Sequence, residues 1–159
     1  MTGRAVAAAS IPARIARLDW PAIEDALDEQ GYATTPALLE ADECAALGRL
    51  FTDEGRFRSR IDMARYRFGV GEYKYFAAPL PAPVAALRTE LYRRLAPVAN
   101  RWMDALGSPE RYPPELATYL ARCAAHGQTR PTPLLLRYTR AVTTASIRTS
   151  TARSRSRSR

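Results

Sequence analysis

Apolar residues recur at helical spacing over much of the chain. The longest such pattern runs from about Pro83 to Leu106, where apolar side chains three or four residues apart predict one long amphipathic helix. Pro97 lies inside it, so the helix is expected to kink there or to divide in two. Three shorter helices are predicted, at residues 19–30 with Asp19 as the N-cap, at residues 40–51 and at residues 114–125.

Strands are predicted at three places. Residues 32–38 form a short candidate strand, and residues 63–68 and 72–76 form a β-ribbon around a turn at Gly69 to Gly71. Charged and aromatic residues alternate in this ribbon, so one face is expected to pack on the long helix and the charged face to meet water. Residues 133–138 predict a buried strand.

The two ends of the chain lack such patterns. The first eighteen residues carry no firm periodicity and are expected to fray. Residues 140–159 consist mainly of Thr, Ser, Ala and Arg, a composition that cannot build a packed core. The expected organisation is a flexible segment at 1–18, one folded unit at 19–139 and a disordered tail at 140–159. Helices and strands together make the expected fold class α+β.

The net charge of +8 is concentrated in the tail. Six arginines and no acidic residue lie within residues 140–159, and the rest of the chain has eighteen basic and sixteen acidic side chains. Such a tail would bind nucleic acid without sequence specificity and in a salt-sensitive way. No apolar run approaches the roughly 18 residues of a membrane span, so no membrane partner is expected. The lone, distant pair Cys44 and Cys123 fits reduced thiols and a cytoplasmic location.

Few side chains suit catalysis. His126 is the only histidine, and its place before Gly127 favours a role at a helix C-terminus. Cys44 lies on an apolar helix face and is expected in the core. Cys123 lies one helical turn before His126, but no motif supports a thiol–imidazole pair. The aromatic and basic residues of the ribbon also resemble a single-stranded RNA platform, so an RNA-binding protein is the alternative function.

Three runs of sequence carry a resemblance to a known family: Gly71 to Phe76, Leu95 to Trp102, and Gly127 to Tyr138, which ends Leu-Leu-Leu-Arg-Tyr. From about Leu18 to Tyr138 the chain resembles the N-terminal half of a bacterial family of Fe(II)/2-oxoglutarate-dependent oxygenases related to prolyl 4-hydroxylases. The resemblance implies helices that buttress the first strands of a double-stranded β-helix, or jelly roll. It also implies iron and 2-oxoglutarate as the cofactors of the family.

In that family the Leu-Leu-Arg-Tyr strand leads to a His-x-Asp pair, and a second histidine completes the iron site. Neither is present here, so no metal ligand and no catalytic residue is assigned, and no cofactor is expected to bind this chain as written. The resemblance places Tyr138 where the family contacts 2-oxoglutarate, while a core tyrosine with a hydrogen-bonded hydroxyl is an equal alternative. Arg137 is expected to be structural, because neighbours on a strand point to opposite faces.

The reading frame offers an explanation for the missing pair. Shifted by one base, the codons for residues 142–152 permit Gly-Asp-Tyr-Ser-Leu-His-Gln-Asp-Leu-Tyr-Gly, which contains a His-x-Asp pair. The sequence thus predicts a truncated, inactive oxygenase with an out-of-frame tail and an unknown substrate. The strand at 133–138 would then have an unpaired edge and an uncovered face, which favours aggregation and marginal stability.

Overall fold

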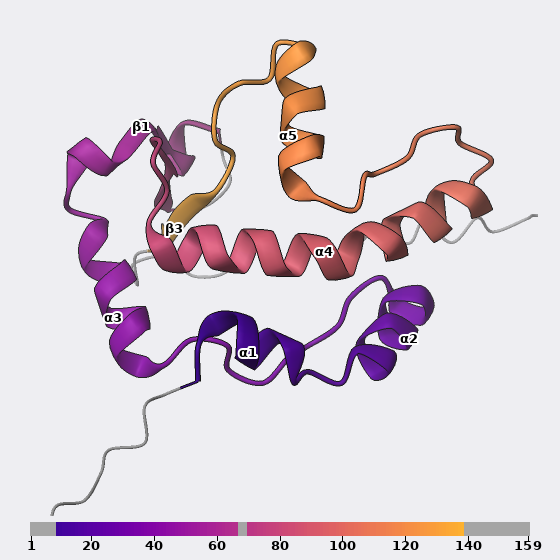
Figure 1. Cartoon of the computed structure of the whole chain (residues 1–159). Coiled ribbons are helices and arrows are strands. Elements are labelled where there is room, and N and C mark those ends of the chain that lie inside the picture. The colour runs from indigo at the N-terminus through magenta and orange to yellow at the C-terminus, as the bar shows by residue number, and fades with distance from the viewer. Residues whose placement is uncertain (1–8, 67–69, 139–159) are drawn as a thin grey trace, which may run out of the picture.

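Helices and one small sheet make up the structure, a computed structural model that describes residues 9–66 and 70–138 (Figure 1). The elements in chain order are α1 (Ile11–Ala16), α2 (Trp20–Gln30), α3 (Ala41–Leu50), η1 (Glu54–Arg56), β1 (Phe57–Asp62), η2 (Met63–Tyr66), β2 (Gly71–Phe76), α4 (Ala82–Ala105), α5 (Leu116–Ala125) and β3 (Leu134–Tyr138). The fold is therefore α+β, as predicted. Among the helices of the described residues, none has the length and apolar character to cross a membrane.

The long helix α4 is the central element of the fold, and α1 and α2 lie along one side of it (Figure 1). It continues through Pro97 as one helix, so of the two expected outcomes, a kink or a division, the structure shows no division. A proline in a helix removes one backbone hydrogen bond and tends to bend the axis. Figure 1 shows such a bend toward the C-terminal part of α4.

The N-terminal helices form an apolar core with α4. Ile15 is 2% exposed and Trp20 is 7% exposed, and Leu87 and Leu91 of α4 pack against their cluster. The indole Nε1 of Trp20 donates a 2.9 Å hydrogen bond to the carbonyl of Ile15. The predicted fraying of the first eighteen residues is thus wrong for residues 9–18. The six-residue helix α1 is too short to show a clear period, and its two buried isoleucines are stabilised by tertiary packing.

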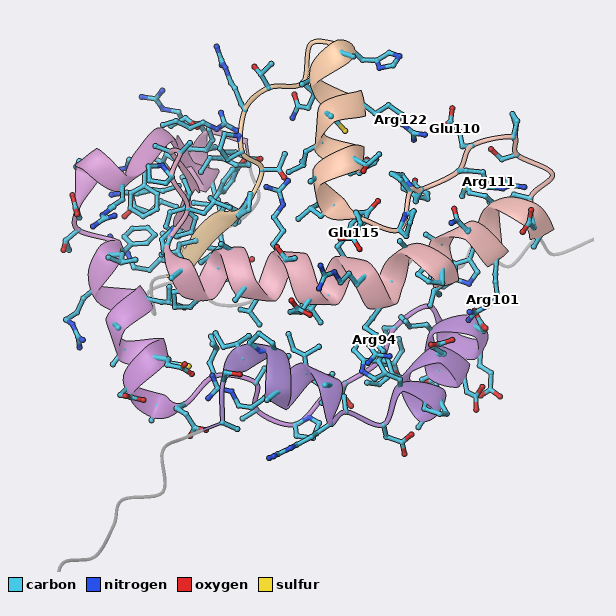
Figure 2. All side chains as sticks on the ribbon, in the orientation of Figure 1. Arg94, Arg101, Glu110, Arg111, Glu115 and Arg122 are labelled. Atoms are coloured by element: carbon cyan, nitrogen blue, oxygen red, sulfur yellow. The ribbon has the colours of Figure 1, made fainter. Side chains whose placement is uncertain are left out.

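Polar contacts hold α2 at the other end of α4. Arg101 pairs with Glu24 at 3.0 Å and with Asp28 at 3.3 Å, and Trp102 Nε1 donates to Asp28 Oδ1 at 2.6 Å (Figure 2). The hydrogen bond from Trp102 and the ion pair with Arg101 lower the pKa of Asp28.

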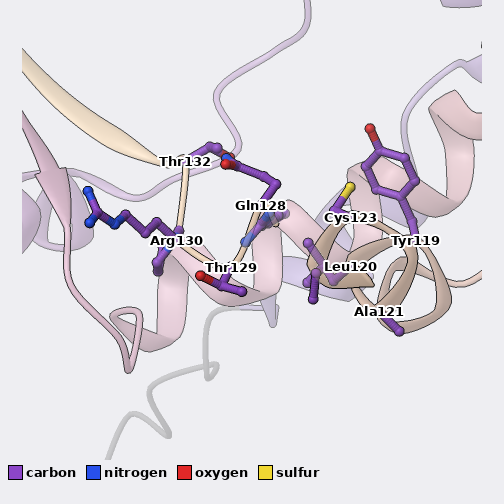
Figure 3. A pocket seen from close by; sticks show the side chains of 11 residues that line it. Tyr119, Leu120, Ala121, Cys123, Gln128, Thr129, Arg130 and Thr132 are labelled. Carbon is purple, nitrogen blue, oxygen red and sulfur yellow. The ribbon is translucent and has the colours of Figure 1, made fainter. Parts of the chain in front are cut away.

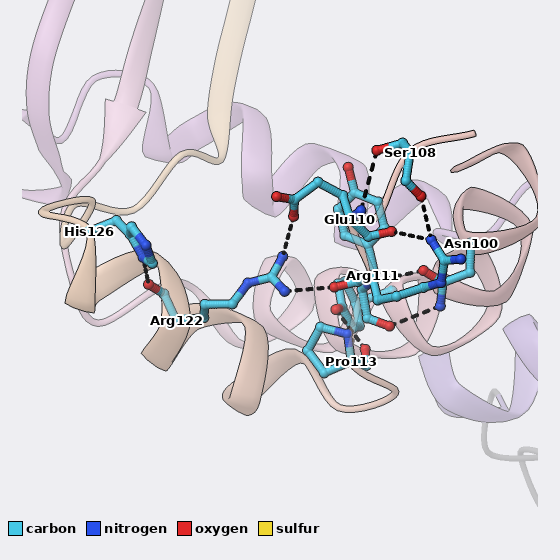
Figure 4. Close-up of polar contacts among 9 residues, drawn as sticks. Asn100, Ser108, Glu110, Arg111, Pro113, Arg122 and His126 are labelled. Carbon is cyan, nitrogen blue, oxygen red and sulfur yellow. Dashed lines mark hydrogen bonds and ion pairs between the residues drawn. The ribbon is translucent and has the colours of Figure 1, made fainter. Parts of the chain in front are cut away.

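The opposite side of α4 carries α5. Tyr92 donates a 2.7 Å hydrogen bond to the carbonyl of Pro113, and the amide of Asn100 forms two bonds with the backbone of Tyr112. Burial raises the pKa of Tyr92. The connection between α4 and α5 is thus fixed by side chains that bond to its backbone (Figure 4).

The sheet contains three antiparallel strands in the order β1-β2-β3. The second strand of the predicted ribbon is confirmed, but its partner is β1, and residues Met63–Tyr66 form a 3-10 helix instead. Apolar and charged residues alternate in β1 as well as in residues 63–68. The two-residue period therefore does not distinguish which of the two segments pairs with β2. The rest of the predicted first strand and part of its turn, residues 67–69, lie outside the described residues.

Two other strand predictions also differ from the structure. Residues 32–38 form no strand, because Ala33 and Leu38 pack on the helical core as part of an irregular segment. The strand near residue 133 exists as β3, but it is not buried: Leu136 is 44% exposed. The predicted tail at 140–159 lies outside the described residues, and the jelly roll and the domain boundaries stay predictions.

Candidate functional site

One face of the sheet forms a shallow cavity of about 420 Å³. We call this surface the open face; it consists of Met63, Tyr73, Tyr75, Leu134, Leu136 and Tyr138. Alternate residues of a strand share a face, and antiparallel pairing puts Tyr73 opposite Leu136 and Tyr75 opposite Leu134. The open face is therefore a direct product of strand alternation in β2 and β3.

Gly71 allows β2 and β3 to approach closely beside Tyr138. A Cβ atom at residue 71 would lie 2.7 Å from the carbonyl oxygen of Arg137, closer than real contacts allow. Gly71 is the pairing partner of Tyr138. The absence of a side chain here thus lets β3 pair with β2 up to its last described residue.

Aromatic and apolar side chains of the open face are accessible in the described part of the chain. Leu134 is 39% and Tyr138 is 66% exposed. The rings of Tyr73 and Tyr75 meet edge to face at 5.7 Å, and the guanidinium of Arg58 lies 4.6 Å from the centre of the Tyr75 ring. A contiguous apolar surface with polar groups at its margin is typical of a binding or packing site.

The opposite face of the sheet carries charged residues, and those of β2 are buried. Glu72 is 8% exposed and Lys74 is 3% exposed. Lys74 Nζ donates to the carbonyl of Phe51 at 2.9 Å and pairs with Glu54, which lowers the pKa of the Glu54 carboxyl. The prediction that the charged face of the ribbon meets water is therefore wrong. The lysine reaches an exposed carboxylate and a carbonyl from a buried position, which makes its burial tolerable.

Arg137 lies on this charged side, as predicted from strand alternation, with its own side chain 52% exposed. Its guanidinium pairs with Glu72 Oε1 and lies 4.2 Å from the centre of the Phe51 ring. Arg60 faces the other oxygen of Glu72 as an ion pair, without the alignment of a hydrogen bond. Two guanidinium groups thus neutralise Glu72 and leave Arg137 turned away from the open face.

Tyr138, the predicted cofactor contact, ends β3 on the open face. Tyr138 is 66% exposed in the described part of the chain, and both the cofactor contact and the core tyrosine stay predictions for a complete domain. Sequence analysis did not identify Met63 as a residue of this face, because it predicted residues 63–68 to be a strand and Met63 lies in the 3-10 helix η2 instead. Met63 is 7% exposed and lies at the base of the open face.

The other candidate residues do not form a catalytic group. His126 is the C-cap of α5, as predicted, and its Nδ1 lies 2.8 Å from the carbonyl of Arg122 (Figure 4). Cys123 interacts with Tyr119, and this contact contributes most to a raised pKa of the Tyr119 hydroxyl. Cys44 is exposed, so the prediction that it lies in the core is wrong. Helix α3 turns Phe51 inward instead, at 5% exposure.

The donor atoms of the described residues do not fit an iron site of two histidines and one carboxylate. In residues 9–66 and 70–138, no three His, Cys, Asp or Glu side chains gather at metal-binding spacing. The sequence contains a single histidine, so one chain cannot supply two imidazole ligands.

Comparison with known proteins finds a match in the part of the chain that contains β2 and β3. Residues 71–145 match the sequence model of a family described as "Oxygenase, catalysing oxidative methylation of damaged DNA". This stretch resembles an oxygenase. The match begins at β2 and takes in α4, α5 and β3, so it includes both strands that form most of the open face.

Two curated relatives are uncharacterized proteins from two strains of Mycobacterium tuberculosis. Each is 41% identical over 63 residues, which is 40% of this chain and 27% of the relative. The chain thus matches little more than a quarter of the length of these relatives. No solved structure matches.

Proposed function

We propose that this chain carries the N-terminal part of an Fe(II)- and 2-oxoglutarate-dependent oxygenase and has no oxygenase activity as written. The observation that carries the proposal is the position of Tyr138 on an open, apolar sheet face, at the end of the last described strand. In a double-stranded β-helix, such a face would line the interior between two sheets. The oxygenase match over residues 71–145 supports this assignment.

In this proposal Tyr138 helps to hold 2-oxoglutarate in a complete domain. Its hydroxyl would donate to or accept from the bound cosubstrate, while Leu134 and Leu136 would exclude water from the same face. Iron would supply the oxygen chemistry of the family. Because the donor atoms present here do not fit iron, we assign no reaction step to this chain.

In this proposal a change of reading frame at the end of the Ala141 codon accounts for the missing ligands. In the shifted frame a His-x-Asp pair is permitted within residues 142–152. The family description names damaged DNA, and we extend that substrate class only to the complete protein.

The test compares two proteins made from the same gene. The DNA is sequenced from the Tyr138 codon onward, and both the printed chain and the chain with the corrected frame are purified. Succinate formation from 2-oxoglutarate is then measured with Fe(II) present. We expect no succinate above the protein-free blank from the printed chain, and turnover from the corrected chain that falls when Tyr138 becomes Phe.

Two results would contradict the proposal. One is chelator-sensitive succinate formation by the printed chain, since one histidine cannot form the expected site. The other is a gene whose shifted frame soon closes with stop codons, because no catalytic half would then exist to restore.

A second candidate function is binding of single-stranded RNA on the open face. It is favoured by three tyrosines on that face and by Arg58, which lies over the ring of Tyr75. Binding that falls steeply with salt and weakens when Tyr73 and Tyr75 become Ala would support it. Binding that disappears only when residues 140–159 are deleted would be due to the tail arginines and would exclude an aromatic platform.

A further inference from the structure

A second cavity lies between α4, α5 and the segment that leads into β3 (Figure 3). Its volume is about 550 Å³, within the range of about 300–1,000 Å³ usual for small-molecule sites. Residues of α5 such as Leu120 and Cys123 form one wall. The polar lining includes Arg88, Tyr119, Gln128, Thr129, Arg130 and Thr132, and we call this cavity the arginine pocket.

The lining is unusual in its charge. It contains two arginines and no Asp or Glu. All sixteen acidic side chains of the sequence lie within the described residues, and none of them forms an ion pair with Arg88 or Arg130. Two arginines without an ion pair to a described carboxylate thus line one cavity.

Neighbouring arginines on the same helices behave differently. Arg93 of α4 pairs with Glu115 at 3.2 Å, and Arg122 of α5 pairs with Glu110 at 3.4 Å (Figure 2). The carboxylates of this region are therefore used by arginines outside the pocket. An ion pair with a protein carboxylate would compete with a bound anion. Arg88 forms no such ion pair with the described carboxylates, which favours ligand binding there.

Arg58 of β1 bonds to the segment that lines the pocket. Its Nε donates a 3.0 Å hydrogen bond to the carbonyl of Pro131, which also lines the pocket. It forms no ion pair with a described carboxylate. This hydrogen bond ties the segment that carries Arg130 and Pro131 to β1.

We propose that the arginine pocket binds a small organic anion through its phosphate or carboxylate group, with Arg88 and Arg130 as the principal contacts. A guanidinium donates two parallel hydrogen bonds to either oxyanion, and the hydroxyls of Thr129 and Thr132 are additional donors. The α5 wall offers an apolar surface to the rest of the molecule. The pocket shares no lining residue with the open face, so this site goes beyond the oxygenase proposal.

The experiment uses the full chain, with inorganic phosphate and citrate as separate probes in isothermal titration calorimetry at low salt. We expect saturable binding of one anion, weaker by about tenfold or more in Arg88→Gln and in Arg130→Gln, as loss of a charge-assisted contact implies. The probe that binds more tightly identifies phosphate or carboxylate as the preferred group. Tryptophan fluorescence verifies that each variant is folded.

Arg49→Gln is the matched control. Arg49 is an exposed arginine of α3 outside the pocket, so the substitution removes the same charge at a different place. The tail arginines contribute equally to all variants and cannot mimic the expected difference. Arg130→Gln keeps the test valid if the partly buried Arg88 is needed for folding, because Arg130 is exposed. Binding that is absent for both probes, or equal in Arg130→Gln and Arg49→Gln, would overturn the proposal.

Discussion

The ammonium group of Lys74 lies beneath the sheet, 2.9 Å from the main-chain carbonyl oxygen of Phe51. The same nitrogen lies 4.6 Å from the centre of the Phe51 ring and pairs with Glu54. The side chain of Lys74 in β2 thus contacts both the carbonyl and the ring of Phe51, the C-cap residue of α3. Because this contact fixes the buried side of β2, it also fixes how Tyr73 and Tyr75 project onto the open face.

Replacing Lys74 with Met is expected to lower the free energy of unfolding by about 1–3 kcal/mol, since a buried carbonyl loses its charged donor. Met fills a similar volume, so the change reports on the hydrogen bond and not on a cavity. Urea unfolding followed by tryptophan fluorescence measures it. Glu54→Gln is the control and should cost clearly less than Lys74→Met, because Glu54 is largely exposed. Equal stability of Lys74→Met and the parent chain would show that the lysine does not support the sheet.

Stability should fall at acid pH because three carboxyl groups have lowered pKa values in the folded chain. They are Asp28, Glu43 and Glu54, each beside a hydrogen-bond donor or a cation. For Glu43 the cause is first the hydrogen bond from Arg14, at 2.7 Å. A lowered folded pKa gives a contribution that is present above the unfolded value, near about 4, and is lost as the pH falls through the folded value.

Urea midpoints measured from pH 7 to pH 3 test this expectation. These three groups should change the urea midpoint little between pH 7 and about pH 5. The midpoint should then fall as the pH drops below about 4, the ordinary pKa range of carboxyl groups. Glu43→Gln should start lower at pH 7 and show a shallower decline. A midpoint that rises as the pH is lowered, or an unchanged slope in Glu43→Gln, would contradict the assignment.

The helices could largely be predicted from the sequence, and the details of the sheet could not. The apolar stripe of α4 and the N-cap Asp19 of α2 are local signals, and both helices begin and end within a residue or so of the prediction. The choice of β1 over residues 63–68 depends on pairing with β2, which is a tertiary event that alternation alone does not encode. Burial of Lys74 was missed for the same reason, since its partners lie some twenty residues away.

Of the candidate site, the sequence predicted that Tyr138 and Arg137 point to opposite faces of the sheet, because strand alternation separates such neighbours. The cofactor contact of Tyr138 stays a prediction. Sequence analysis missed the arginine pocket, whose two cations are 42 positions apart in the numbering, at Arg88 and Arg130. No spacing rule joins a residue of α4 to one of the segment after α5. Only the packing of these elements brings them to one cavity.

Gly71→Ala is expected to weaken the pairing of β2 with β3. The added Cβ would lie 2.7 Å from the carbonyl oxygen of Arg137, so the strands must separate. A strained substitution of this kind costs about 1–3 kcal/mol, which urea unfolding can measure. Gly48→Ala is the matched control: nothing lies within 4 Å of its Cβ in α3, so it should stabilise by about 0.5–1 kcal/mol. A neutral Gly71→Ala would mean that β3 is not held at this register.

Leu136→Thr tests whether the open face is accessible in the printed chain. Leu136 is 44% exposed, whereas Phe76 on the buried side of β2 is 1% exposed. We expect Leu136→Thr to cost less than about 1 kcal/mol and to raise the soluble fraction, because it removes exposed apolar area. Phe76→Ala should cost about 3–5 kcal/mol.

The chain with the corrected frame gives the same substitution a different expected result. If further strands then cover the open face, Leu136 becomes interior, and its loss should cost about 2 kcal/mol or more, as for other buried leucines. The same variant therefore tests whether the open face is exposed in the printed chain and whether it is covered in the corrected chain. A large cost already in the printed chain would mean that the open face is covered there, while a small cost in both proteins would mean that the restored strands do not pack on it.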